Sequence, residues 1–173
     1  MKVLILYATV EGQTGKIARF VQEQIEALGH EATLANADDP AELPIDGADA
    51  VVLAAPVHQR RHPRNFEALV SARKDDLAAR KVLMLTVSLN AAFAEGREEA
   101  ADYLLEMKMR TGLEPTAELL VAGAVRTGEY DYFAKQVVEH VVMRGRDYDR
   151  SVDEHEFTDW DALATALKAF LKG

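Results

Sequence analysis

Short apolar runs alternate with amphipathic helical stretches along most of the chain, and this alternation restricts the possible folds more than any other feature. The apolar runs have the length of buried strands. They predict strands at residues 3–7, 31–35, 50–55, 82–87 and 119–125. Apolar side chains at helical spacing predict helices at residues 14–28, 65–77 and 95–110, and a last helix starting at Thr158. This rhythm is typical of an α/β domain, in which helices cover both faces of a doubly wound, five-stranded parallel sheet.

The chain has 173 residues, which suits one domain. We therefore expect a single domain over residues 1–173, with an insertion at residues 126–157 between the fifth strand and the last helix. The first half of the insertion carries an apolar stripe at helical spacing, from Tyr130 to Val142. That stripe either packs on the domain as core or covers a binding site. The charged second half, residues 144–156, is expected to be an exposed loop.

Several functional classes are excluded by composition. There is no cysteine, so disulfides, thiolate metal sites and a cysteine nucleophile are all ruled out. The net charge of −9 disfavours general binding to nucleic acid, whose phosphates would repel the protein. The histidines lack the spacing of metal ligands, and we expect no metal. The N-terminal residues do not have the pattern of a signal peptide, and no apolar stretch approaches the ~20 residues of a membrane span. We expect a cytoplasmic protein.

The loop between the first strand and the first helix predicts a phosphate site. Two threonine hydroxyls flank a glycine at a helix N-terminus, where free backbone N–H groups and the helix dipole favour an anion. The alternative is that the two threonines only cap the helix, and the loop alone leaves both interpretations open. The spacing of Gly12 and Gly15 before Lys16 does not fit a P-loop. The residues of this predicted site are Thr9, Val10, Glu11, Gly12, Gln13 and Thr14.

This loop also resembles the phosphate loop of flavodoxins, a strand followed by T-x-x-G-x-T and a helix. Here it reads ILYATVEGQTGKIA. With the segments VAGAVR and FTDW and the long insertion, the chain resembles one flavodoxin-like branch over nearly its whole length, the menaquinone-dependent protoporphyrinogen IX dehydrogenases. The resemblance implies a flavodoxin-like sheet with strand order 2-1-3-4-5 and a noncovalent FMN cofactor.

For function, the resemblance implies an FMN-dependent oxidoreductase of heme biosynthesis. Such an enzyme oxidises protoporphyrinogen IX to protoporphyrin IX and passes the electrons to a quinone, with at most peripheral contact at the inner face of the membrane. The alternative is a flavodoxin-type electron carrier, which has a protein redox partner and no substrate of its own. We expect no catalytic side chain, because the flavin carries the chemistry itself.

The resemblance further implies that backbone atoms after the third strand run beside the flavin, at Ala55, Pro56, Val57, His58 and Gln59. Where the branch typically has Arg-Tyr-Gly, this chain has His-Gln-Arg, so an aromatic residue and a glycine are missing. The residues themselves predict a cationic cluster in an acidic chain, made of Arg60, Arg61 and Arg64 with His58 and His62. This cluster either attracts a substrate carboxylate through Arg60 and Arg61 or is an ordinary solvated loop.

Two more loops complete the predicted site. After the fourth strand, small polar residues let the backbone approach a flat ring, so Ser88, Leu89 and Asn90 are candidate flavin contacts; alternatively Ser88 or Asn90 caps a turn. By the resemblance, Gly123 borders the cofactor. Arg126 either meets a substrate carboxylate or pairs with Glu129 or Asp131.

Overall fold

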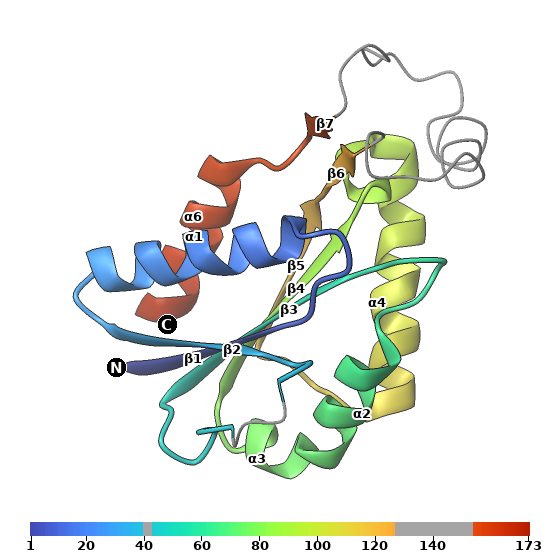
Figure 1. The fold of residues 1–173 in the computed structure, drawn as a ribbon. Coiled ribbons are helices and arrows are strands. Elements are labelled where there is room, and N and C mark those ends of the chain that lie inside the picture. Colours follow the sequence, from blue (N-terminus) through green and yellow to red (C-terminus); the bar gives the residue numbers. More distant parts are fainter. Residues whose placement is uncertain (40–42, 127–153) are drawn as a thin grey trace.

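A single five-stranded parallel sheet forms the centre of the molecule (Figure 1). The computed structural model describes residues 1–39, 43–126 and 154–173. The order is β2-β1-β3-β4-β5, which confirms the predicted order and fold class. The strands are β1 (Lys2–Tyr7), β2 (Glu31–Asn36), β3 (Ala50–Pro56), β4 (Lys81–Ser88) and β5 (Ala117–Ala122).

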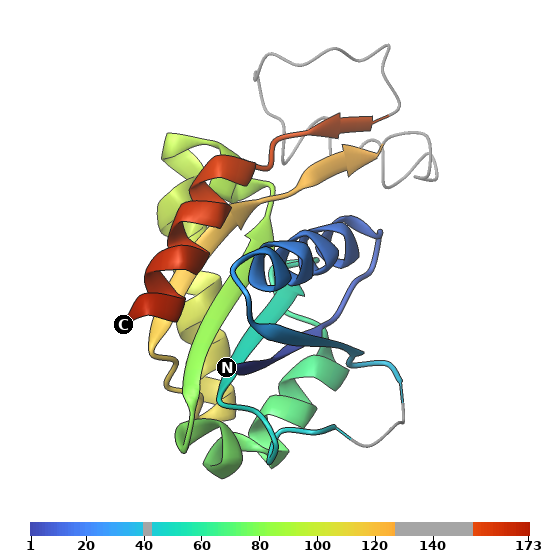
Figure 2. The ribbon, with the colours of Figure 1, turned by 90° about the vertical axis from the view of Figure 1, so that its left-hand side faces the viewer.

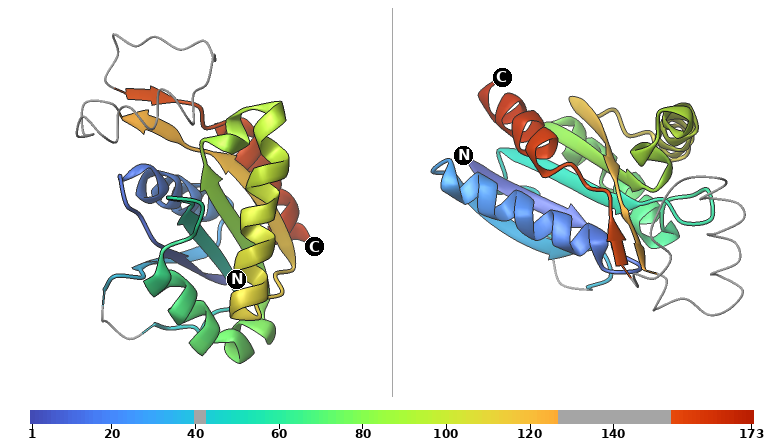
Figure 3. Two further views of the ribbon diagram at one scale, coloured as in Figure 1. Left: turned by 90° about the vertical axis from the view of Figure 1, so that its right-hand side faces the viewer. Right: turned by 90° about the horizontal axis from the view of Figure 1, so that it is seen from above.

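Helices cover both faces of the sheet (Figures 2 and 3). One face packs under α1 (Gln13–Ala27) and α6 (Trp160–Lys172), and the apolar side chains of these helices share one buried cluster with the strands. The other face packs under α2 (Arg64–Ala72), α3 (Lys74–Ala78) and α4 (Arg97–Thr111) and forms a second cluster around Phe66 and Met107. Burial on both faces is why the central strands β1 and β3 are apolar at nearly every position and not at alternate ones.

The second helical region differs from its prediction. Residues 65–77 do not form one helix but two, α2 (Arg64–Ala72) and α3 (Lys74–Ala78), divided at Arg73. Asp75 and Asp76 lie in the first turn of α3, where acidic side chains are favoured, and Arg73 Nε lies 2.5 Å from Asp76 Oδ2. These local interactions stabilise a new helix start inside a continuous apolar pattern.

The helix predicted at residues 95–110 is observed as α4 (Arg97–Thr111). Two short 3-10 turns precede it, η1 (Asn90–Ala92) and η2 (Ala94–Gly96). The two turns pack closely at Gly96, where a Cβ atom would lie 2.5 Å from the Asn90 carbonyl oxygen. A larger residue at this position would force the loop after β4 to move.

The predicted fifth strand is divided at Gly123 into β5 and β6 (Ala124–Arg126). β6 pairs antiparallel with β7 (Glu154–Glu156), with Ala124 opposite Glu156 and Arg126 opposite Glu154. We call these two strands the β6–β7 arm. The prediction that residues 144–156 are an exposed loop is therefore wrong for residues 154–156, because main-chain pairing to β6 makes them a strand. The predicted apolar stripe of the insertion lies outside the described residues.

The last helix begins two residues later than predicted. Asp159 is its N-cap, and its carboxylate accepts a hydrogen bond from Ala162 N–H at 3.0 Å. Thr158 is not the cap, because its hydroxyl donates to the Ala122 carbonyl oxygen at 2.6 Å and so joins α6 to the end of β5. Within the described ranges, no helix has the length and apolar character needed to cross a membrane.

Candidate functional site

The predicted site loops meet at the carboxyl ends of the strands, as expected for ligand sites in an open parallel sheet (Figure 1). Main-chain hydrogen bonds join neighbouring loops. Val57 N–H donates to the Val87 carbonyl at 2.8 Å, and Gly123 N–H donates to the Ser88 carbonyl at 3.1 Å. Ala8 N–H, just after β1, donates to the Ala54 carbonyl at 2.9 Å, so the ends of β1, β3, β4 and β5 and the loops that follow them form one continuous edge.

The phosphate loop ends in an α1 N-terminus without a side-chain cap. The N-cap is Gly12, whose φ of 95° is a left-handed conformation that glycine adopts easily. Thr9 Oγ1 accepts a hydrogen bond from Gly12 N–H at 2.9 Å, and Thr14 is a buried residue of the first turn. Within the described part of the chain, neither threonine caps α1, which argues against the capping interpretation. Uncapped N–H groups and two nearby hydroxyls fit a phosphate monoester.

The loop after β3 forms a tight hairpin. His58 and Arg61 exchange main-chain hydrogen bonds of 2.9 and 3.2 Å, with Gln59 and Arg60 as the two turn residues. Both have positive φ angles, 50° and 67°, in a region where asparagine and glycine are favoured. The backbone is thus strained at the position where the sequence departs from the branch it resembles. Strain of this kind is concentrated at functional sites.

The two arginines of this hairpin lie in different environments. The Arg60 side chain is 79% exposed and lies 4.0 Å from Glu99. The Arg61 guanidinium instead lies 2.6 Å from the buried Glu67 carboxylate, which also binds Arg110 at 2.6 Å. Burial alone would raise the pKa of Glu67, but hydrogen bonds from Arg110 and Arg61 outweigh it and hold that pKa below its ordinary value. Much of the charge of Arg61 is therefore compensated within the fold.

His62 does not belong to the cationic surface in which the sequence pattern placed it. It is 1% exposed, and its Nε2 atom lies 3.3 Å from Thr86 Oγ1. Its Nδ1 atom has no hydrogen-bond partner among the described residues. Burial, with a smaller contribution from Arg110, lowers the pKa of His62 to about 4, so the imidazole is neutral at physiological pH. Nearby Glu67 opposes this shift.

The geometry of the loop after β4 is compatible with both of its predicted roles, contact with the flavin and capping of a turn. Ser88 is buried, and its hydroxyl accepts a hydrogen bond from Ala91 N–H at 3.3 Å, as in a turn cap. Leu89 precedes η1 and Asn90 is its first residue. Gly123 lies beside this loop, and a Cβ atom there would lie 3.4 Å from Val87 Cγ1. Arg126 ends β6, while its predicted partners, Glu129 and Asp131, lie outside the described residues.

Sequence reasoning missed a polar network around Glu156. Its Oε2 atom accepts from Gln13 Nε2 at 3.1 Å and lies 2.5 Å from Lys16 Nζ, while Oε1 accepts from Trp160 Nε1 at 2.9 Å. Burial would raise the pKa of Glu156, but the hydrogen bonds from Lys16, Trp160 and Gln13 together lower it. Gln13 Nε2 also donates to Thr158 Oγ1 at 3.0 Å. No local pattern predicts the contact between Gln13 and Glu156, because 143 positions separate them in the sequence.

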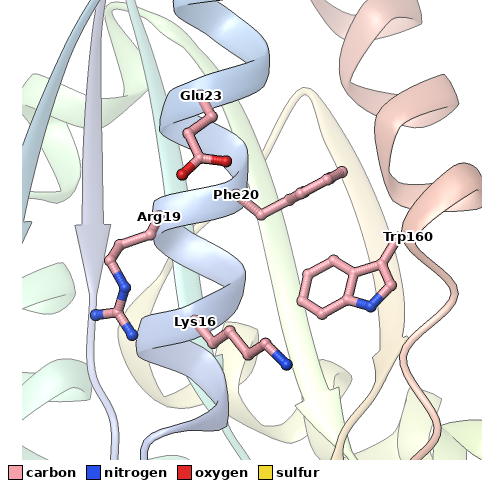
Figure 4. Close-up of a pocket in the computed structure, with 5 residues that line it drawn as sticks. All are labelled: Lys16, Arg19, Phe20, Glu23 and Trp160. Atoms are coloured by element: carbon pink, nitrogen blue, oxygen red, sulfur yellow. The ribbon is translucent and has the colours of Figure 1, made fainter.

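An open groove runs beside this network between α1 and α6 (Figure 4). Its volume is about 400 Å³, and the rings of Phe20 and Trp160 lie 4.8 Å apart within it. No residue of the loops after β3 or β4 lines it, so we do not assign it to the predicted site. The lining residues are Lys16, Arg19, Phe20, Glu23 and Trp160.

Comparison with known proteins gives matches over most of the chain. The family model described as a flavodoxin domain matches residues 4–153. Protoporphyrinogen IX dehydrogenase (quinone) from Escherichia coli strain K12 is 27% identical over 166 residues, which cover 95% of this chain and 91% of that protein.

Solved flavodoxins have the same fold. A short-chain flavodoxin associated with a PDU bacterial microcompartment aligns with a TM-score of 0.61 and 14% identity, covering 99% of this chain and 97% of the other. Oxidised flavodoxin 1 from Bacillus cereus aligns with a TM-score of 0.58 and 15% identity, covering 99% and 98%. At these identities the likeness concerns the fold alone.

Proposed function

The chain belongs to the flavodoxin domain family, and on that premise we propose that it oxidises protoporphyrinogen IX to protoporphyrin IX and passes the electrons to a quinone. It is a flavodoxin-like protein whose cofactor is FMN. The observation that carries the substrate assignment is the similarity to the Escherichia coli dehydrogenase, which spans nearly the whole of both chains. The proposal includes a role in heme biosynthesis with menaquinone as acceptor. It also includes a cytoplasmic location with peripheral contact at the inner face of the membrane.

We assign residues 1–173 to one domain and place FMN along the edge formed by the loops after β1, β3 and β4. The uncapped N-terminus of α1 supports this placement, since it offers donors to a terminal phosphate. The proposed phosphate residues are Thr9, Val10, Glu11, Gly12, Gln13 and Thr14. The proposed ribityl and ring contacts are Ala55, Pro56, Val57, His58, Gln59, Ser88, Leu89, Asn90 and Gly123.

Bound FMN supplies the redox chemistry, in which a hydride equivalent leaves the porphyrinogen and the electrons go on to the acceptor. The protein binds and orients the reactants. Arg60, largely exposed beside the cofactor edge, and Arg126 at the end of β6 are the proposed contacts for substrate carboxylates. Arg61 remains part of that proposal, although its guanidinium is already paired with Glu67. Oxidation of one protoporphyrinogen to protoporphyrin releases six electrons and six protons, so three quinones, each taking up one pair of electrons with two protons, become three quinols and the exchange balances.

A flavodoxin-type electron carrier is the second candidate. The full-length fold match to solved flavodoxins favours it, as does a net charge of −9, which suits docking to a basic redox partner. Such a carrier would need no porphyrinogen site. The two candidates share the cofactor and differ in whether the protein turns over a small-molecule substrate.

The deciding experiment mixes purified, FMN-loaded protein with protoporphyrinogen IX and a soluble menaquinone analogue without oxygen. We expect protoporphyrin fluorescence to rise together with quinol formation, and both to depend on FMN loading. Protein stripped of FMN is the matched control. If the loaded protein accepts electrons from a flavodoxin reductase but produces no porphyrin above this control, it is the carrier.

A further inference from the structure

Glu156 lies where the β6–β7 arm, the start of α1 and the start of α6 meet. Its carboxylate receives the Gln13 amide and the Lys16 ammonium on one oxygen and the Trp160 indole N–H on the other. Figure 4 shows Lys16 and Trp160 extending toward each other from their two helices. One side chain on β7 therefore contacts both helices that cover this face of the sheet.

Gln13 connects Glu156 to the phosphate loop. It is the first residue of α1, between the left-handed Gly12 and the buried Thr14. Its side chain is almost fully buried, and its amide donates to Glu156 at the end of β7 and to Thr158 on the segment that joins β7 to α6. Because the Gln13 backbone belongs to the uncapped first turn, fixing its side chain also fixes the direction of the N–H groups offered to a phosphate.

We propose that Glu156 is a positioning residue for the phosphate loop, and that through Gln13 it couples FMN affinity to docking of the β6–β7 arm. The proposal rests on the assignment of residues 9–14 to the FMN phosphate made above. Glu156 also lies opposite Ala124 in the arm, so the residue that holds the Gln13 side chain is itself part of the pairing between β6 and β7. Glu156 thus holds both the phosphate loop and the β6–β7 arm, which leads into the insertion.

Coupling of this kind is reciprocal. If a docked arm increases the affinity for FMN, then bound FMN must stabilise the docked arm by the same factor. The arm therefore responds to whether the cofactor is present, and this response can be measured without any substrate.

A simple charge effect predicts the opposite outcome. Glu156 carries a negative charge near the proposed site for a phosphate dianion. Its carboxylate also pairs with the Lys16 ammonium, which is then not available to the phosphate. If charge were all that mattered, removing the carboxylate would strengthen FMN binding, and added salt would reduce the gain. Positioning predicts weaker binding instead, so the direction of the change separates the two explanations.

The test is an FMN titration of Glu156→Ala, Gln13→Ala and the double variant, at low and high salt. We expect each single variant to bind FMN about tenfold more weakly, and the double variant to be no weaker than either, since both remove one link. Asp161→Ala is the matched control, because Asp161 is an exposed carboxylate in the first turn of α6. It should leave FMN affinity unchanged. Tighter binding by Glu156→Ala, or additive losses in the double variant, would overturn the proposal.

Hydrogen exchange gives a second readout on the same proteins. FMN should slow exchange of the β6–β7 amides in the parent protein and have little effect on them in Glu156→Ala. An equal effect in both proteins would contradict the coupling. Thr14→Val tests the assignment of the phosphate loop separately. If this variant binds FMN with unchanged affinity, the loop does not bind the phosphate, and the premise of the proposal is wrong. A weakened Thr14→Val beside an unaffected Glu156→Ala refutes the positioning role alone.

Discussion

Thr14 offers a direct test of the cofactor assignment with a change of one functional group. Replacing its hydroxyl by a methyl group in Thr14→Val keeps the volume of this buried side chain but removes a donor. We expect FMN binding to weaken by about 1–3 kcal/mol, because a buried phosphate oxygen loses a hydrogen bond. Thr33→Val on the exposed side of β2 is the control and should bind FMN like the parent. The measurement is quenching of FMN fluorescence on titration.

His62 makes stability depend on pH. Its folded-state pKa of about 4 lies below the ordinary value of 6.5, so protons bind the unfolded chain more readily between these values. This titration therefore leaves the free energy of unfolding at its full value above about pH 6.5 and lowers it as the pH falls toward 4. The loss amounts to roughly 3 kcal/mol at about 1.4 kcal/mol per pKa unit.

The check is denaturant unfolding of the parent and of His62→Gln across this pH range. The free energy of unfolding should fall less steeply with acid in the variant, because the titrating group is gone. Parallel curves for the two proteins would show that His62 does not titrate as its burial implies.

At the scale of residues, local chemistry was readable from the sequence and distant contacts were not. A threonine, a glycine and a second threonine before a helix pattern favour either an anion site or a helix cap, and the uncapped start of α1 supports the anion site. His62 stands beside three arginines in the sequence, yet the fold turns it inward to Thr86 while the Arg61 side chain binds Glu67. Neighbours in the sequence do not reveal which side chain faces the core.

At the scale of elements, the strained hairpin after β3 should be easy to stabilise. In Gln59→Asn/Arg60→Gly, the turn residues become those that tolerate positive φ angles. We expect a gain of about 1 kcal/mol, and a melting temperature higher by roughly 2–4 °C for a domain of this size. Arg60→Ser is the control, since it removes the charge but keeps a side chain at a positive φ angle. If this control is stabilised as much as the glycine variant, relief of strain is not the cause.

The element boundaries show where periodicity is informative and where it is not. Apolar spacing located β1, β3, β4 and α1 closely, because these elements bury their side chains along their whole length. It ran across the break at Arg73, because Leu77 continues the helical spacing of Phe66 and Val70, and across the end of β5 at Gly123, because the residues on both sides of Gly123 are apolar. Breaks of this kind depend on caps and on close main-chain approach, which apolar periodicity does not record.

At the scale of the whole molecule, the domain should not need residues 127–153 to fold. Arg126 and Glu154 are opposite each other in the β6–β7 arm, so an Asn-Gly turn can join them directly. We expect the shortened protein to fold and to bind FMN, because the arm and Glu156 are retained. We expect it to lose porphyrinogen turnover if the insertion, whose residues 127–153 lie outside the described ranges, covers the binding site. Circular dichroism, FMN titration and the porphyrin assay check these outcomes, and full turnover would exclude a catalytic part for the insertion.

The overall architecture was predictable because it depends on many residues at once. Five apolar runs separated by helical patterns leave few topologies, and the observed strand order is the expected one. The antiparallel arm was not predictable, because β7 is short, charged and far from β6 in the sequence. β7 pairs with β6 through main-chain hydrogen bonds, and no pattern of side chains in the sequence indicates such pairing.

The place of α6 in the sequence has a consequence for biosynthesis. Its residues Leu163, Leu167 and Phe170 complete the cluster that α1 shares with the strands, yet every packing partner of α6 precedes it in the sequence. A nascent chain can therefore pair β1 with β2 and β3 early, while the sheet face near β4 and β5 remains uncovered until α6 leaves the ribosome. During that interval the partly made protein presents an apolar surface of the kind to which chaperones bind and from which aggregation starts.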